Sequence, residues 1–191
     1  MQPFNIYLCG VGGQGIGLLS EILLRASDYA GYCAKAVDTH GLAQRGGTVI
    51  SQIRLGEVVH TPLIPERTAD LVVALERHEA LRAMQMSLRD QGTLVYYDTV
   101  LQPLGVRLGT EPETSTDMIN NGCAQRGIKV YGVARANTPD TRMENIIVLS
   151  CIHRNRLIPD LQEEHFLQAM EDLLTGTILE ANLRLFHKPW E

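Results

Sequence analysis

The stretch CGVGGQGIGLLSEILL, residues 9–24, sets five glycines within eight positions directly ahead of an apolar run. Before it, Phe4, Ile6 and Leu8 alternate with Asn5, Tyr7 and Cys9, a pattern typical of a short β-strand. After it, apolar residues recur at helical spacing, at Ile16, Leu19, Leu23, Ala26 and Ala30. The first thirty residues therefore predict a strand, a glycine-rich turn and an amphipathic helix, which Gly31 ends.

The remaining sequence continues the alternation of strands and helices. The predicted strands are residues 33–37, 48–56, 69–75, 93–98 and 128–133. The predicted helices are residues 76–89, 142–152, 165–174 and 177–187, while residues 99–116 are expected to form an excursion over the surface. Strands separated by helices predict a single-domain, open doubly wound (Rossmann-like) and mainly parallel sheet with helices on both faces.

Length and composition narrow the class of protein. A chain of 191 residues with 45% hydrophobic content can bury one substantial core, so we expect a single domain over residues 1–191. The formal net charge of -5 argues against nucleic acid as a partner. The longest apolar runs, such as residues 146–152, are far too short to cross a membrane. The scattered Cys9, Cys33, Cys123 and Cys151 form no metal-binding cluster, and we expect reduced thiols in a cytoplasmic protein.

The glycine-rich turn has the form of a dinucleotide-binding fingerprint. Gly10, Gly12 and Gly15 match G-x-G-x-x-G between a predicted strand and a predicted helix, with Gly13 and Gln14 between them. Amides at a helix start can face a phosphate. Asp38 ends the second strand, where such a domain places its ribose-binding acid. The alternative is that the glycines only permit a tight turn and close packing of helix on strand.

A second polar loop follows Asp38, with the sequence THGLAQRGGTV over residues 39–49. It carries His40, Gln44 and Arg45 ahead of Gly46. The planar guanidinium of Arg45, beside a flexible glycine backbone, is suited to bind a carboxylate or a phosphate. The alternative is an ordinary polar loop with an exposed arginine and a structural histidine. Because no nucleophile with a partnered base is evident beside His40, we assign no catalytic residue and no metal ligand to this chain.

Together the two motifs resemble a known family. GVGGQG (10–15) and DTHGLAQRGGTVISQIRLG (38–56) are similar to the gamma domain of the 2-oxoacid:ferredoxin oxidoreductases, and most closely to the small beta subunits of its indolepyruvate branch. The resemblance continues through TPLIPERTADLVVALE (61–76) and the C-terminal EANLRLF (180–186). One departure is Asp38, where the family pattern leads us to expect glutamate.

The resemblance implies a reaction that this chain does not perform alone. Such enzymes oxidatively decarboxylate a 2-oxoacid to an acyl-coenzyme A and pass the electrons to ferredoxin. They use thiamine diphosphate with magnesium and iron-sulfur clusters, for which this sequence offers neither a G-D-G motif nor clustered cysteines. The resemblance therefore implies a cofactor-free subunit, inactive alone, packed against a large chain that carries these cofactors.

The resemblance also suggests roles for both loops. Gly10, Gly12, Gly13, Gln14 and Gly15 would lie towards the coenzyme A side of the active centre. The loop from His40 to Gly47 would face the large subunit or the thiamine site, with Arg45 as an anion contact. An aryl pyruvate substrate is implied only by the indolepyruvate branch.

Three other functions remain open at this point. One is a stand-alone NAD- or flavin-binding module whose specificity acid is Asp38, although this does not explain the AQRGG sequence. Another is an activating enzyme of ubiquitin-like carriers, against which stands the lack of C-x-x-C pairs. The last is a non-enzymatic assembly subunit.

Overall fold

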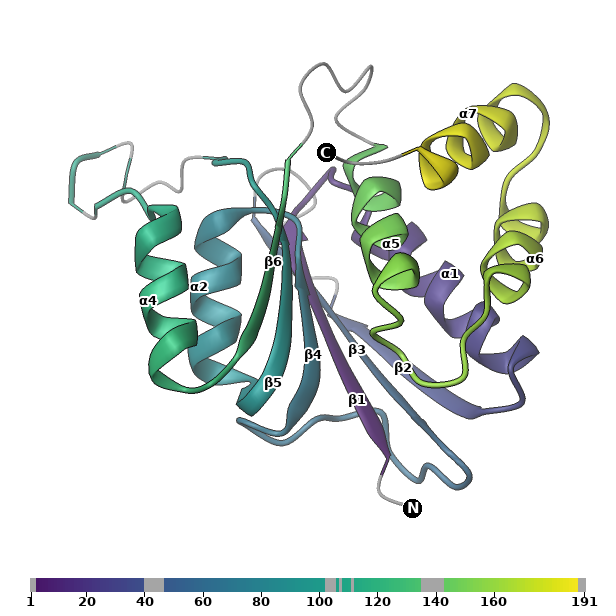
Figure 1. Cartoon of the computed structure of the whole chain (residues 1–191), viewed down its shortest axis with the longest axis horizontal. Coiled ribbons are helices and arrows are strands. Elements are labelled where there is room, and N and C mark those ends of the chain that lie inside the picture. The colour runs from purple at the N-terminus through teal and green to yellow at the C-terminus, as the bar shows by residue number, and fades with distance from the viewer. Residues whose placement is uncertain are drawn as a thin grey trace.

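The computed structural model describes residues 3–39, 47–101, 106, 108–110, 112–134 and 143–188, and every structural statement below concerns these residues. A single α/β domain is built on a six-stranded sheet in the order β2-β3-β1-β4-β5-β6 (Figure 1). The strands are β1 (Phe4–Val11), β2 (Cys33–Thr39), β3 (Thr48–Gly56), β4 (Ala69–Ala74), β5 (Leu88–Tyr97) and β6 (Lys129–Val133).

Strand β3 is the exception to an otherwise parallel sheet. It runs antiparallel to both β1 and β2, whereas β1, β4, β5 and β6 pair in parallel. The expectation of a mainly parallel sheet is confirmed. The first strand–helix–strand unit differs from a dinucleotide-binding unit, however, because β3 lies between β1 and β2.

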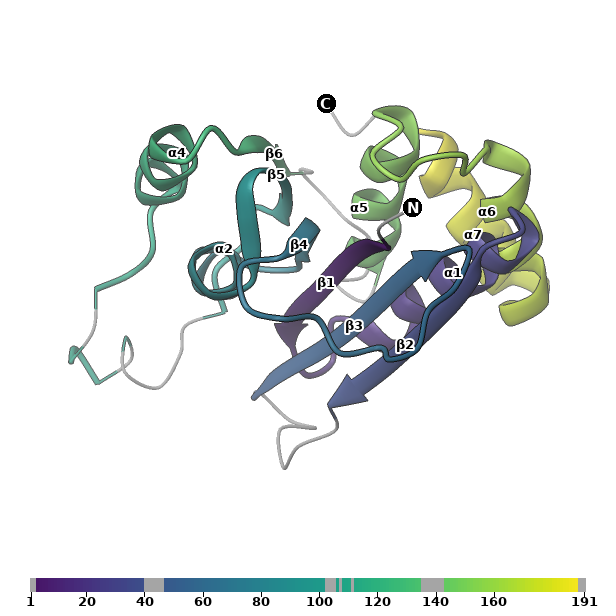
Figure 2. The same cartoon turned by 90° about the horizontal axis from the view of Figure 1, so that it is seen from below.

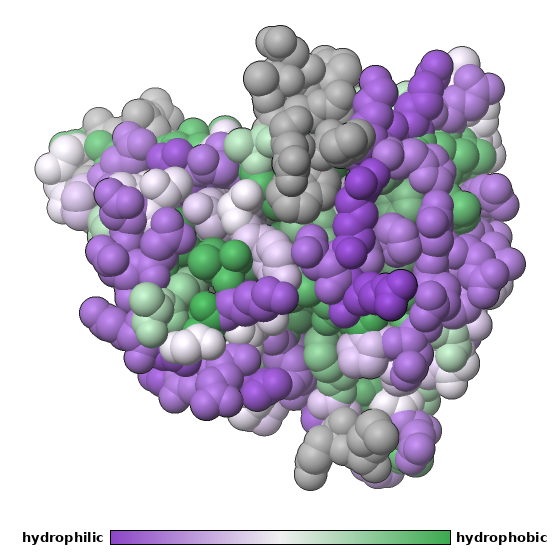
Figure 3. All heavy atoms as spheres, viewed as in Figure 1, coloured by the Kyte–Doolittle hydropathy of each residue, from purple (hydrophilic) through white to green (hydrophobic). Residues whose placement is uncertain are grey.

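Helices cover both faces of the sheet, as predicted (Figure 2). One face carries α1 (Ile16–Tyr29), α5 (Glu144–Arg154), α6 (Glu163–Leu173) and α7 (Gly176–His187). The other carries α2 (Arg77–Met86) and α4 (Thr116–Gln125). None of the helices described is both long and apolar enough to span a lipid bilayer. Seen from the front, the outer surface is mostly hydrophilic, with a hydrophobic patch between α4 and β6 (Figure 3).

Side-chain alternation in the strands divides the core between the two faces. Ile6 and Leu8 of β1 pack towards α1, while Cys9 packs towards α2. In β4 every residue except Asp70 is buried, with Leu71 and Val73 on the α1 face and Val72 and Ala74 on the α2 face. The prediction that residues 69–75 form a strand covered on both faces is therefore confirmed.

Two elements differ from the sequence-based expectation. The helix predicted over residues 76–89 ends at Met86, and β5 starts at Leu88, which pairs with Ala69 ahead of a register shift. Leu88 fits the helical period but packs between the sheet and α2. Helix α4 was not predicted, because its sequence TDMINNGCAQ contains two asparagines and a glycine and buries only Ile119 and Cys123.

Candidate functional site

The glycine-rich turn joins β1 to α1 at the carboxyl edge of the sheet. Gly13 (φ 104°) and Gly15 (φ 81°) adopt left-handed backbone that only glycine takes without strain, and Gly15 is the N-cap of α1. A Cβ on Gly10 would lie 3.1 Å from both Gln14 Oε1 and Ile16 Cδ1. Glycine is therefore required here for the shape of the turn itself, whatever it binds.

Helix α1, like α5 and α7, begins without a side-chain cap. Among the described residues, no side chain accepts from its first amides, and no acid lies in its first turn. Helix α2, by contrast, is capped by Glu76, whose carboxylate accepts from the amides of His78 and Glu79. The first amides of a helix have no intrahelical acceptor and carry partial positive charge. A hollow of about 350 Å³ lies over this end of α1, lined by Val11, Gly12, Gly13, Gly15, Ile16, Gly17 and Val49.

Gln14 points into the protein rather than towards that hollow. Its Oε1 accepts from the amide of Val11 at 2.8 Å, and its Nε2 donates to the carbonyl oxygen of Leu75 and to Glu144 Oε2, 3.3 Å away. The side chain is buried, so its hydrogen bonds tie β1, the end of β4 and α5 together. Gln14 therefore holds the glycine loop in position.

Asp38 lies near the end of β2, where the sequence placed it, but two strands away from the glycine loop. It is opposite Ser51 of β3, and Ser51 is opposite Leu8 of β1. Adjacent strands are about 4.8 Å apart, so roughly 10 Å separates Asp38 from β1. A ribose-binding acid is expected on the strand next to β1, and this geometry disfavours a stand-alone dinucleotide module.

A short polar chain holds Asp38 in place. Ser20 Oγ of α1 lies 2.8 Å from Ser51 Oγ and 3.5 Å from Asp38 Oδ1. Ser20 and Ser51 are buried, so α1 is hydrogen-bonded to both β2 and β3 on this face.

His40, Gln44, Arg45 and Gly46 lie outside the described residues, and their roles stay predictions. The end of their loop is described: the amide of Gly12 donates to the carbonyl oxygen of Gly47 at 2.9 Å. The two loops are therefore neighbours at this point.

A second cavity at the same edge was not predicted from the sequence. It has a volume of about 500 Å³ between α2, the residues that lead into α4, and the start of β3, and we call it the α2–α4 cavity. The polar residues that line it are Thr48, His78, Glu79, Arg82, Gln85 and Thr114. The available signal was the ERHE sequence at residues 76–79, which follows β4 where parallel strands present ligand-binding loops.

Glu79 is the central group of the α2–α4 cavity. Its Oε1 accepts from Thr48 Oγ1 at 2.9 Å, and its Oε2 pairs with Arg82. Burial raises the pKa of the Glu79 carboxyl group, while Arg82 and Thr48 act in the opposite direction. Thr114 Oγ1 lies 2.9 Å from His78 Nδ1, and His78 Nε2 is enclosed with no partner among the described residues.

The cysteines do not suit an iron-sulfur cluster. Burial raises the pKa of the Cys123 thiol to about 11 and that of the Cys151 thiol to about 12, and it also raises that of Cys9. Cluster ligation needs thiolates gathered in one place. Here Cys9 and Cys123 lie on the α2 face, Cys151 lies on the α1 face, and Cys33 is exposed.

Comparison with known proteins places this geometry in a family. Residues 5–189 match the family described as pyruvate ferredoxin/flavodoxin oxidoreductase. The indolepyruvate oxidoreductase subunit IorB of Methanothermobacter thermautotrophicus is 32% identical over 190 residues, which cover 96% of this chain and 94% of that one. IorB of Archaeoglobus fulgidus is 33% identical over 185 residues, which cover 94% and 90% of the two chains.

Solved structures share the fold. The gamma subunit of a keto/oxoacid ferredoxin oxidoreductase from Geobacter sulfurreducens gives a TM-score of 0.65 at 18% identity, over 96% of this chain and 94% of that one. The 2-oxoglutarate:ferredoxin oxidoreductase of Magnetococcus marinus, solved with 2-oxoglutarate, coenzyme A and succinyl-CoA bound, gives 0.68 at 18% identity, over 97% of this chain and 30% of that one. The chain belongs to the pyruvate ferredoxin/flavodoxin oxidoreductase family.

Proposed function

We propose that this chain is the small subunit of an indolepyruvate or other 2-oxoacid:ferredoxin oxidoreductase complex, and that it binds no cofactor on its own. The complex would convert a 2-oxoacid, coenzyme A and two oxidised ferredoxins into an acyl-coenzyme A, carbon dioxide, two reduced ferredoxins and a proton. The observation that carries the proposal is the match along nearly the whole chain to relatives named indolepyruvate oxidoreductase subunit IorB. An aryl pyruvate is the substrate that these names favour.

The cofactors belong to the partner in this proposal. A large subunit would carry thiamine diphosphate, magnesium and iron-sulfur clusters, which supply carbanion stabilisation and one-electron transfer. The cysteines of this chain are unsuited to a cluster for the reasons given above. All four are free thiols, which accords with a reducing cytoplasm as the compartment of the complex.

The glycine loop would contribute an anion contact on the coenzyme A side. The first turn of α1 lacks a side-chain cap and an acid, and Gly12, Gly13, Gly15 and Gly17 line the hollow over it. Such a helix start attracts a pyrophosphate. Gln14 would hold the loop rather than touch the ligand, because its amide is already bonded to Val11, Leu75 and Glu144.

The loop from His40 to Gly47 would lie against the large subunit or the thiamine site. Its end is hydrogen-bonded to the glycine loop through Gly47 and Gly12, which supports a site formed by both. Arg45 is the group in it best suited to bind a carboxylate or a phosphate, and Asp38, His40, Gln44 and Gly46 complete the proposed contact region.

Anaerobic purification of the tagged chain from its native host tests the proposal. We expect a larger brown protein with iron, labile sulfide and thiamine diphosphate to co-purify, and the complex to reduce a viologen with an aryl pyruvate and coenzyme A. Recovery of a colourless chain that binds NAD or a flavin would contradict the proposal.

A matched pair of variants tests the role of Arg45. We expect Arg45→Ala to raise the Michaelis constant for coenzyme A or to weaken subunit assembly. Arg67→Ala removes an exposed arginine that pairs with Asp90 and serves as the control. Unchanged Michaelis constant, turnover and assembly in Arg45→Ala would remove its proposed role.

A further inference from the structure

The α2–α4 cavity is larger than the hollow over the glycine loop, about 500 Å³ against 350 Å³, and lies on the opposite face of the sheet. The alternation of β3 separates the two, because Thr48 faces the α2–α4 cavity and Val49 faces the hollow. The wall of the α2–α4 cavity is formed by α2, by Thr48 at the start of β3, and by Pro112, Thr114 and Met118 at the start of α4.

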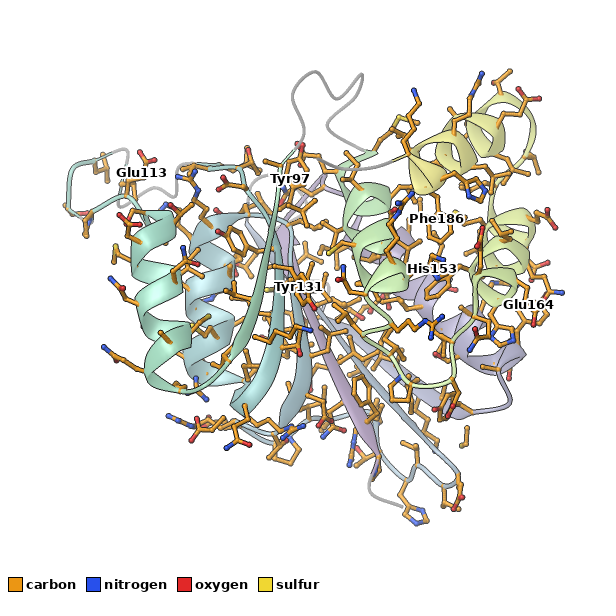
Figure 4. The ribbon with its side chains drawn as sticks, viewed as in Figure 1. Tyr97, Glu113, Tyr131, His153, Glu164 and Phe186 are labelled. Atoms are coloured by element: carbon orange, nitrogen blue, oxygen red, sulfur yellow. The ribbon has the colours of Figure 1, made fainter. Side chains whose placement is uncertain are left out.

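Negative charge dominates among the described residues around this cavity. Glu79 forms part of its wall, and the buried Glu76 lies at the adjoining end of α2. Glu113 and Asp117, which neighbour lining residues in sequence, are exposed, and Figure 4 shows Glu113 above the start of α4. In the part of the chain that the structure describes, the nearby guanidinium groups are engaged, Arg77 with Asp98 and Arg82 with Glu79. An incoming phosphate would be repelled here, whereas a cation would be attracted.

The Glu79 carboxylate can still accept a further donor. A carboxylate has about four lone-pair positions, and the hydrogen bonds to Thr48 and Arg82 use two of them. Arg82 is 46% exposed, so its pairing with Glu79 leaves it free to shift. Burial has already raised the pKa of the Glu79 and Glu76 carboxyl groups, and an added cation would favour their charged forms.

The rim of the cavity is apolar. Leu81, Pro112 and Met118 line it, and the Met118 side chain is 42% exposed on α4. Methionine and arginine are both enriched at protein–protein interfaces. Negative charge beside an exposed methionine fits a protein segment better than it fits a small anionic substrate.

We propose that the α2–α4 cavity is a docking socket for a basic segment of the large subunit, in which an arginine or lysine side chain reaches Glu79 and an apolar neighbour covers Met118. This inference rests on the proposed function, since it takes the large subunit as the occupant. The socket adds a contact on the face of the sheet opposite the glycine loop, so that the large subunit would contact the carboxyl edge of the sheet on both faces.

Two methionines provide a matched test in the full chain. Met118→Asp places a carboxylate in the apolar rim of the socket, and we expect the dissociation constant for the large subunit to rise at least tenfold. Met86→Asp is the control, because Met86 is 55% exposed at the end of α2 and does not line the cavity. We expect less than a twofold change for it, and circular dichroism and thermal unfolding check that both variants fold.

Charge substitutions give a second readout that does not depend on Met118. Glu79→Gln keeps the size of the side chain but removes the charge, and it should weaken association severalfold and reduce its salt dependence. Asp117→Lys puts a cation at the rim and should weaken association as well. Glu171→Lys, at an exposed position of α6 on the other face, is its control.

The outcomes separate this inference from the proposed function. If no large subunit co-purifies with the wild-type chain, both the proposed function and the docking socket are overturned. If the wild type associates and Met118→Asp, Glu79→Gln and Asp117→Lys all associate as tightly, only the socket is overturned. If these variants lose turnover while they keep the large subunit, the cavity serves a diffusible cationic ligand and the docking role is overturned.

Discussion

The side-chain amide of Asn145 donates to the carbonyl oxygen of Gly15 at 3.1 Å, across 130 positions of sequence. Its Oδ1 accepts from the amide of Ile146 at 2.8 Å. Asn145 is 0% exposed, so both polar ends of its amide are satisfied within the protein. Helix α5 therefore fixes the backbone of the glycine loop at Gly15.

Replacement of Asn145 should destabilise the fold through this contact. Asn145→Leu keeps a similar volume but removes the acceptor of the Ile146 amide and one of two donors to the Gly15 carbonyl oxygen, which keeps the Leu19 amide. The loss should cost about 1–3 kcal/mol in the free energy of unfolding. Asn145→Asp should cost more, because a carboxylate oxygen would then face the carbonyl oxygen. Urea unfolding measures both. Asn155→Ala, which loses a half-buried hydrogen bond to the Cys151 carbonyl oxygen, should cost less, and an equal loss would contradict the special role of Asn145.

Glu144 should make the protein less stable as the pH rises. Burial raises the pKa of its carboxyl group above the ordinary value of 4.5, although the Gln14 hydrogen bond acts in the other direction. The folded state then binds more protons than the unfolded state, so the free energy of unfolding falls as the pH rises from 4.5 through the folded pKa. We expect Glu144→Gln to be more stable than wild type at pH 7, with the difference vanishing near pH 4.

The measurement for Glu144 is urea unfolding at several pH values. Glutamine at this position still accepts from Gln14, so the variant removes the charge and keeps the hydrogen bond. Glu171→Gln, an exposed position, controls for the loss of one carboxyl group. A wild-type pH profile in Glu144→Gln would refute the prediction.

Local sequence patterns predicted most of the fold, because the order of apolar and polar residues in a strand indicates which of its faces are buried. The alternation in residues 48–56 gave the bounds of β3, and the apolar run of residues 69–75 gave β4. The pairing of strands depends on the whole sheet, however, and the sequence of β3 does not indicate that this strand lies between β1 and β2. Helix α4 was missed because its stability comes from packing, with Gly122 allowing close approach to Met84 of α2.

The candidate site was predictable only where a motif constrains the backbone. The glycine turn and its helix follow from GVGGQG, and the structure adds a contact with the next loop at Gly47. That Gln14 points inward could not be predicted, because its partners Leu75 and Glu144 come from distant segments. The α2–α4 cavity likewise joins Thr48, Glu79 and Thr114, which no spacing in the sequence connects.

Gly17 offers a test of stability against binding. A Cβ at this position meets no atom within 4 Å, and the residue lies in the first turn of α1 on the wall of the hollow. Gly17→Ala should therefore stabilise the chain by up to about 1 kcal/mol. The added methyl group would also narrow the hollow, so the complex should show a higher Michaelis constant for coenzyme A.

Gly92→Ala is the contrast to Gly17→Ala, measured by thermal unfolding. A Cβ on Gly92 would lie 3.0 Å from the Arg89 carbonyl oxygen and 3.1 Å from that of Asp70, and the backbone of two strands cannot easily yield. We expect the melting temperature to fall for Gly92→Ala and to rise for Gly17→Ala. A fall in both would show that the first turn of α1 is more tightly packed than these distances indicate.

An aromatic cluster holds α5, α6 and α7 together (Figure 4). The ring of His153 stacks on Phe186 at 5.2 Å between centroids and meets Phe166 edge-on at 5.5 Å. Glu163 Oε2 lies 3.6 Å from His153 Nε2, and Glu163 Oε1 lies 3.3 Å from His187 Nδ1. His153 Nδ1 is buried with no partner among the described residues.

Protonation of His153 should loosen this cluster. Burial lowers its pKa, as do Arg154 and His187, while Glu163 acts in the opposite direction. The unfolded state then binds more protons, so the free energy of unfolding should rise with pH between the folded pKa and the unfolded value of about 6.5. His153→Phe and His153→Gln should both remove this slope in urea unfolding from pH 5 to 8. Phenylalanine should be the more stable of the two because it keeps the ring contacts, whereas a slope that persists in both variants would place the titrating group elsewhere.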